Sequence, residues 1–225
     1  MSIVDTLYAV STNPLVLLLV GGGMSGILVP YFTRRWQDRQ EELKLKRELI
    51  LELSNAVTKI LRAVELTADK SKDPKEFNSS KEDWFKATPN IGAQIHTYFY
   101  KSKRRIRDFW DNYKRVINQY SNLVRQKDVT EREKSFNAIC KSLGVITKIK
   151  EEDDKSYTKD DFDSLVDGFK KLLTASDAKS EIVYGEGWSD LHSKMFDLKH
   201  DLMKLILESN IDGFSKGLFD SIRGR

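Results

Sequence analysis

The feature that most constrains the fold is an uncharged run near the N-terminus, LVLLLVGGGMSGILVPYF at residues 15–32. A run of this length is near the lower limit for a helix that crosses about 30 Å of hydrocarbon. A secretory signal peptide fits less well, because residues 1–14 contain no Lys or Arg and such a peptide begins with a positive region. A buried core helix would need apolar surroundings that the rest of the chain does not offer. The sequence therefore predicts one transmembrane helix over residues 15–32.

The flanks of this segment predict its orientation in a lipid bilayer. Tyr31 and Trp36 bracket its C-terminal end, as aromatic side chains do at a membrane interface, and Arg34 and Arg35 follow directly. Positive charge gathers on the cytoplasmic side of membrane proteins. We therefore expect residues 1–14 to form a short extracytoplasmic N-terminus and the bulk of the chain to be cytoplasmic.

Small residues in the middle of the run form a candidate helix-packing face made of Gly22, Ser25 and Gly26. A Gly-x-x-x-Gly spacing lets two membrane helices approach closely. The alternative is that Gly is simply frequent in membrane helices. We favour association, either with further copies of this chain or with another membrane protein.

The rest of the sequence predicts an all-α bundle of about four to six helices. Charged residues make up 32% of the chain, and there are only 4 Pro, which favours solvated helices over sheets. Residues 33–67 are predicted as a charged stalk and first long helix, because apolar residues recur there every seven positions, at Leu43, Ile50, Val57 and Val64. Residues 68–90, which contain two Pro and many polar residues, are predicted as a loop.

The bundle proper is predicted over residues 91–209. Its clearest helix is expected from Gly92 to Arg125, where one seven-residue row holds Phe99, Ile106, Tyr113 and Tyr120. A capping box, Thr130-x-x-Glu133, predicts the start of the next helix. Residues 210–225 are expected to form a short amphipathic C-terminal helix, which would either cap the bundle or contact a membrane surface.

A basic cluster is the candidate contact for RNA or anionic lipid. It consists of Lys101, Lys103, Arg104, Arg105 and Arg107. Basic residues beside aromatics can bind single-stranded nucleic acid or lipid headgroups. We favour a simpler interpretation, a solvated helix face, because helical periodicity already explains the aromatics as core residues.

Catalytic motifs are not found. The sequence has no phosphate-binding Gly-rich loop with a Lys, no His-Glu-x-x-His, and a single cysteine, Cys140, on an apolar face. His192 and His200 lie on one predicted helix but two turns apart, which is too far for one metal ion without a third element. We therefore expect no enzyme activity, no metal site and no cofactor.

Two functions remain open from the sequence. The first is a single-pass membrane protein that self-associates through its glycine face, in its extreme form an oligomeric pore or membrane effector. The second is an accessory or tethering subunit of a larger membrane complex. The layout, one membrane helix before a catalytically bare helical domain, resembles that of membrane accessory proteins of RNA-targeting CRISPR loci. This resemblance covers layout alone, and no motif residue is matched.

Overall fold

The structure of the chain is a computed structural model. It describes Pro14, Gly22, Gly26 and residues 29–68, 74–100, 104–126, 128–153, 159–174 and 186–212. The chain divides into two compact units, Met1–Leu45 and Lys46–Arg225.

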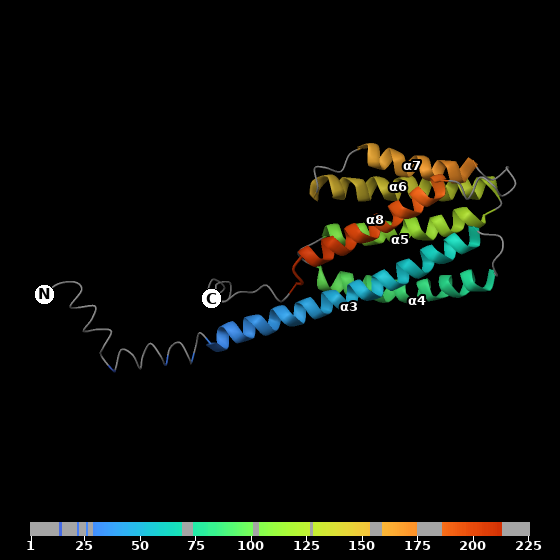
Figure 1. Ribbon diagram of the computed structural model, residues 1–225. Helices are drawn as coiled ribbons and strands as arrows, with labels where there is room; N and C mark the ends of the chain where they lie inside the picture. Colours follow the sequence, from blue (N-terminus) through green and yellow to red (C-terminus); the bar gives the residue numbers. More distant parts are fainter. Residues whose placement is uncertain are drawn as a thin grey trace. The chain divides into compact units, whose positions relative to one another are not determined.

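The described part is helical, and no strand occurs within it. This confirms the prediction of an all-α bundle. The helices, labelled as in Figure 1, are α3 (Val29–Ala68), α4 (Pro74–Tyr98), α5 (Arg104–Arg125), α6 (Val129–Asp153), α7 (Lys159–Thr174) and α8 (Glu186–Glu208). Within these residues, no helix is sufficiently long and apolar for a membrane crossing. The predicted membrane segment, 15–32, and the predicted amphipathic helix, 210–225, lie for the most part outside the described residues.

In the second unit, successive helices alternate in direction (Figure 1). Helix α5 packs against α4, α6, α7 and α8, so it is the centre of the bundle. Side chains join α3 to its two neighbours. The Glu52 carboxylate accepts hydrogen bonds from Asn90 (2.7 Å) and Gln94 (2.9 Å) of α4, and Lys199 of α8 donates one to Thr58 (3.3 Å).

The aromatic row predicted from the sequence is the core of this bundle. Phe99, Ile106, Tyr113 and Tyr120 are all fully buried. The Tyr113 hydroxyl donates a 2.8 Å hydrogen bond to the backbone oxygen of Met195, which links α5 to α8. A buried phenol needs such a partner, since an unsatisfied hydroxyl in the core costs about 1–3 kcal/mol.

The prediction of a loop over residues 68–90 is wrong from Pro74 onward, because α4 begins there. Pro is tolerated at the first position of a helix, where its missing N–H has no partner in any case. The inner face of α4 then follows helical spacing through buried side chains, at Phe77, Ser80, Trp84, Thr88, Ile91 and Ile95. The polar composition of residues 74–90 indicated a loop, but the packing of a few apolar side chains stabilises a helix there. Trp84 is part of the core, whereas Phe85 is 52% exposed.

The single helix predicted from Gly92 to Arg125 is two helices. Residues up to Tyr98 complete α4, and α5 begins at Arg104. Helices α4 and α5 run in opposite directions (Figure 1). Phe99, just after α4, and Ile106, in the first turn of α5, are both fully buried. The bundle therefore starts earlier than the predicted residue 91, since α3 from Lys46 onward and all of α4 belong to it.

The start of α6 is capped by Asp128, two residues before the predicted Thr130. The Asp128 carboxylate accepts a 3.0 Å hydrogen bond from the backbone N–H of Glu131, and its carbonyl accepts one from Arg132. Asp128 and Glu131 have the spacing of a capping box, as Thr130 and Glu133 do. Arg132, Ser135 and Ile139 lie on the buried face of the helix that follows.

Candidate functional site

The glycines of the predicted packing face have open space around them. A Cβ atom added at Gly22 or at Gly26 would meet nothing within 4 Å. Ser25, the third member of this face, lies outside the described residues. Within the described part, therefore, no other segment of the chain packs closely enough on these two positions to require glycine.

The predicted interface residues lie at the start of α3. The Tyr31 ring contacts the Phe32 ring edge-to-face, with 5.6 Å between centroids. Arg34 and Arg35 are exposed, and Trp36 is 64% exposed. Large aromatic side chains with this much exposure are unusual on a solvated helix.

The basic cluster is only partly described, because Lys101 and Lys103 fall outside the described residues. Arg104 lies 3.4 Å from Asp108 on the same helix. Arg105 donates a 3.0 Å hydrogen bond to the backbone oxygen of Ile149 and lies 3.4 Å from Glu152, so it fastens α5 to the end of α6. Arg107 stacks over the Tyr100 ring at 5.7 Å. Arg105 is thus held against α6, whereas the Arg104 side chain is 85% exposed and Arg107 lies over a Tyr100 ring that is itself 66% exposed.

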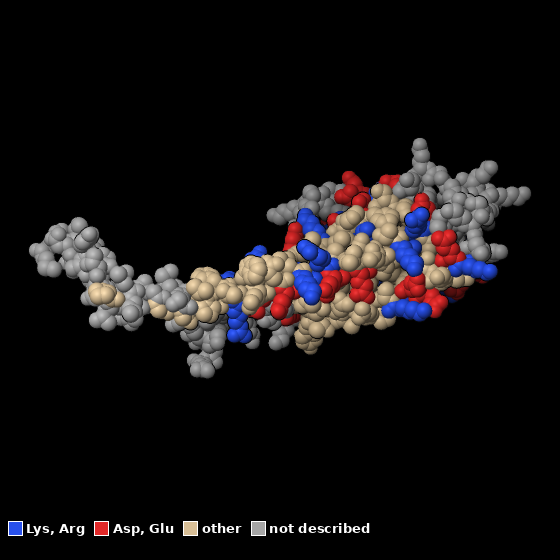
Figure 2. All heavy atoms as spheres, turned by 60° about the horizontal axis from the view of Figure 1, so that its bottom comes forward, with Lys and Arg blue, Asp and Glu red and all other residues tan. Residues whose placement is uncertain are grey.

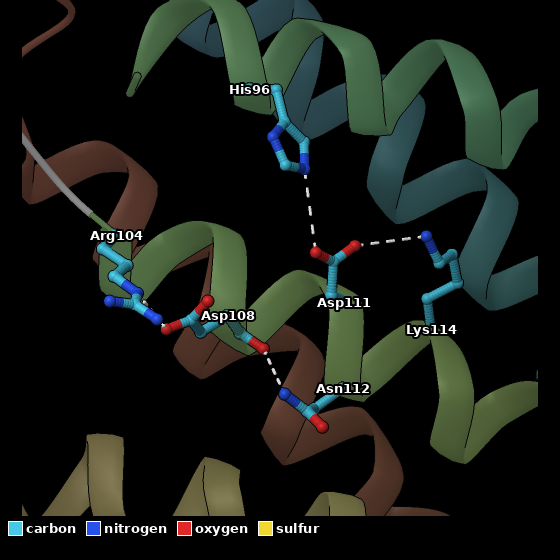
Figure 3. Close-up of polar contacts among 6 residues, drawn as sticks. All are labelled: His96, Arg104, Asp108, Asp111, Asn112 and Lys114. Carbon is cyan, nitrogen blue, oxygen red and sulfur yellow. Dashed lines mark hydrogen bonds and ion pairs between the residues drawn. The ribbon is translucent and has the colours of Figure 1, made fainter. Parts of the chain in front are cut away.

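A polar group on α4 and α5, which the sequence did not single out, lies near this cluster (Figure 3). The Asp111 carboxylate lies between His96 Nε2 of α4, at 3.7 Å, and the Lys114 ammonium, at 3.2 Å. Beside it, the Asn112 side chain donates a 2.7 Å hydrogen bond to the Asp108 carbonyl. The His96 side chain is half exposed. Ion pairs in such a position contribute little to stability.

His192, one of the two histidines predicted on the last helix, lies between α8 and α3. Its Nε2 is 3.8 Å from the Glu65 carboxylate, and its ring contacts Phe196. Burial lowers the pKa of His192, and the Glu65 charge offsets part of that effect. His200 is exposed on the same helix. In the described part of the chain, no group of three or more His, Cys, Asp or Glu is placed to hold a metal ion.

A shallow groove of about 330 Å³ runs between α7 and α8. It is lined by Asp160, Asp163, Ser164, Asp167, Gly168, Lys171 and Asp190. The Lys194 ammonium lies across it, 2.7 Å from Asp190 and hydrogen-bonded to Ser164. Lysines thus offset part of the acidic charge within the groove.

Cys140 is half-buried on α6. Burial raises the pKa of its thiol, which lowers the fraction of reactive thiolate at neutral pH. This placement agrees with the sequence interpretation of Cys140 as a packing residue.

The face of the molecule shown in Figure 2 carries Lys and Arg side chains interspersed with Asp and Glu. Lys59 with Asp83, and Lys86 with Glu82, pair opposite charges on α3 and α4. No large field of one sign, of the kind that binds nucleic acid, dominates this face.

No protein-family model, no curated protein and no solved structure matches this chain.

Proposed function

We propose that this protein is a single-pass, membrane-anchored helical protein that associates with further copies of itself and acts without catalysis. The uncharged segment 15–32 would be its anchor, and the bundle would lie in the cytoplasm. In its extreme form, the assembly would be a pore or another membrane effector.

One observation carries the self-association. Gly is poor in a helix unless close packing requires it, because it loses more backbone freedom than other residues on folding. Within the described residues, a Cβ added at Gly22 or Gly26 would meet no atom within 4 Å. An intermolecular contact would account for glycine at both positions.

We also propose that the protein has no catalytic activity, and the polar side chains of the bundle support this. Its polar groups, such as His96 with Asp111 and His192 with Glu65, are paired across helices. Neither pair lines the groove between α7 and α8.

The molar mass of the detergent-extracted particle, measured by light scattering with correction for detergent, tests the proposal. We expect a discrete homo-oligomer. Gly22→Ile and Gly26→Ile should each reduce its mass, because a branched side chain keeps two helix backbones apart. Gly23→Ile is the matched control, since it adds the same side chain about 100° around the helix. A monomeric wild-type particle would contradict self-association.

An accessory or tethering subunit is the second candidate. The open space around Gly22 and Gly26 would suit a helix of another membrane protein as well as a second copy. In that case, the particle purified from its native membrane would contain one copy of this chain with other chains. A homo-oligomer would instead justify a conductance measurement in planar bilayers.

A further inference from the structure

The first part of α3 exposes a row of large apolar side chains. Val29, Trp36 and Leu43 are spaced seven residues apart and are 58%, 64% and 42% exposed. Phe32, between the first two, is 62% exposed. In the described part of the chain, nothing covers these side chains to the extent that the core of the bundle is covered.

The same seven-residue row continues along α3 into the core. Val57 and Val64 keep the spacing of Val29, Trp36 and Leu43, and both are fully buried. Leu53 and Ile60, on the companion row that begins at Phe32, are 0% and 1% exposed. A single helix thus carries apolar residues on one face, a seam that is buried in its second part and exposed in its first, with Arg39 and Lys46 interrupting the companion row. A seam with this repeat is the pattern that packs one helix against another in a coiled coil.

We propose that residues 29–43 of α3 form a parallel, in-register coiled coil with the same residues of a second copy of this chain. This inference rests on the proposed self-association and names a second surface for it, outside the glycine face. Two copies anchored in one membrane with the same orientation would meet in parallel. The anchor also raises their effective concentration, so a short seam is sufficient.

A lipid surface accounts less well for the whole row. The predicted membrane segment ends at residue 32, and a helix rises about 1.5 Å per residue. Val29 and Phe32 would lie within the segment and Trp36 about 6 Å beyond it, which an interface can reach, whereas Leu43 would lie about 16 Å beyond it, past the depth to which an interfacial side chain inserts. A second helix can cover all of these positions.

Charge along the seam favours a second copy. With Val29, Trp36 and Leu43 at the first heptad position, Glu42 and Arg47 occupy the two flanking positions that face each other between parallel helices. Arg47 lies about one turn beyond residue 43, so Glu42 of each copy would lie opposite Arg47 of the other at the C-terminal end of the coil. Arg39, at the companion position after Phe32, is exposed. Its long side chain can carry the charge past the seam to water.

Disulfide cross-linking of the full-length chain in membranes tests the coil. In a Cys140→Ala background, Leu43→Cys places a thiol on the seam, where identical residues of two parallel helices come within disulfide range. Glu41→Cys is the control, on the opposite side of the same helix turn. We expect Leu43→Cys to cross-link at least about tenfold faster than Glu41→Cys under mild oxidation, because a disulfide requires Cα atoms within about 7 Å. Equal rates at both positions would overturn the proposal.

Charge exchange is the second test. Glu42→Arg places like charges opposite each other, so cross-linking of Leu43→Cys should slow, and adding Arg47→Glu should restore it. Absence of cross-linking at Leu43→Cys in a particle whose mass shows several copies would overturn the coil and leave the proposed function standing. A monomeric particle would overturn both.

Discussion

The indole Nε1 of Trp84 in α4 donates a 2.7 Å hydrogen bond to the side-chain oxygen of Asn118 in α5. Trp84 is 2% exposed, so its N–H has no route to bulk water. The same indole lies beside Trp110, with 6.1 Å between ring centroids. This bond joins α5 to α4, the helix that lies where the sequence composition predicted a loop.

Asn118→Ala should destabilise the protein, because it leaves the buried Trp84 N–H without an acceptor. The expected loss in the free energy of unfolding is about 1–3 kcal/mol. Urea unfolding followed by circular dichroism measures it. Gln119→Ala, a half-buried neighbour on the same helix, is the control and should cost less. Equal losses for the two variants would show that the Trp84 bond contributes nothing of its own.

Two glycines in the bundle should respond oppositely to alanine. At Gly168 of α7, an added Cβ would lie 3.2 Å from Leu191 Cδ1 of α8 and 3.4 Å from its Cβ. Leu191 is 1% exposed and cannot easily move, so Gly168→Ala should lower the melting temperature. At Gly144 of α6, a Cβ would meet nothing within 4 Å. Gly144→Ala should stabilise by up to about 1 kcal/mol through helix propensity. Calorimetry of both variants checks the signs, and a stabilised Gly168→Ala protein would contradict the close contact between α7 and α8.

Stability should fall in mild acid because of His192. Burial lowers the pKa of this histidine in the folded state below its ordinary value near 6.5. In acid, the unfolded chain therefore binds more protons than the folded chain does. The stability that neutral His192 contributes is fully present above pH 6.5, and it is lost as the pH falls through the lower pKa of the folded state. The free energy of unfolding of a His192→Gln variant should therefore depend less on pH between 7.5 and 5 than that of the wild type. His200→Gln, at an exposed position, is the control, and an unchanged slope in His192→Gln would refute the assignment.

Tyr113 and Tyr120 should resist ionisation in the folded protein. Burial raises the pKa of both phenols above the ordinary value near 10, and nearby carboxylates, Asp201 and Glu65, add to the effect. The stability that the neutral phenols contribute is present below pH 10 and is lost as pH rises further. Absorbance at 295 nm should show part of the tyrosine signal appearing only with the loss of helical circular dichroism. Titration of all 8 tyrosines before unfolding would contradict their burial.

Sequence periodicity predicted the aromatic core well. Ile106, Tyr113 and Tyr120 are buried as expected, because they form an apolar stripe at helical spacing on α5. Phe99 is buried too, but it follows α4 and is not part of that helix. The polar pairs of the candidate sites could not be predicted from the sequence. His96 with Asp111, and His192 with Glu65, join different helices, and nothing local in the sequence indicates which helices are neighbours.

By itself, the sequence determined that the chain is helical, that its helices bury aromatic faces, and that α3 carries a seven-residue seam. These properties follow from local spacing. Only the tertiary structure decided that residues 74–90 are helical, that α4 and α5 run in opposite directions, and that the seam is buried from Leu53 but exposed at Trp36. The physical reason is that burial of Trp84 and Phe77 against distant residues outweighs the weak preference of a polar segment for loops.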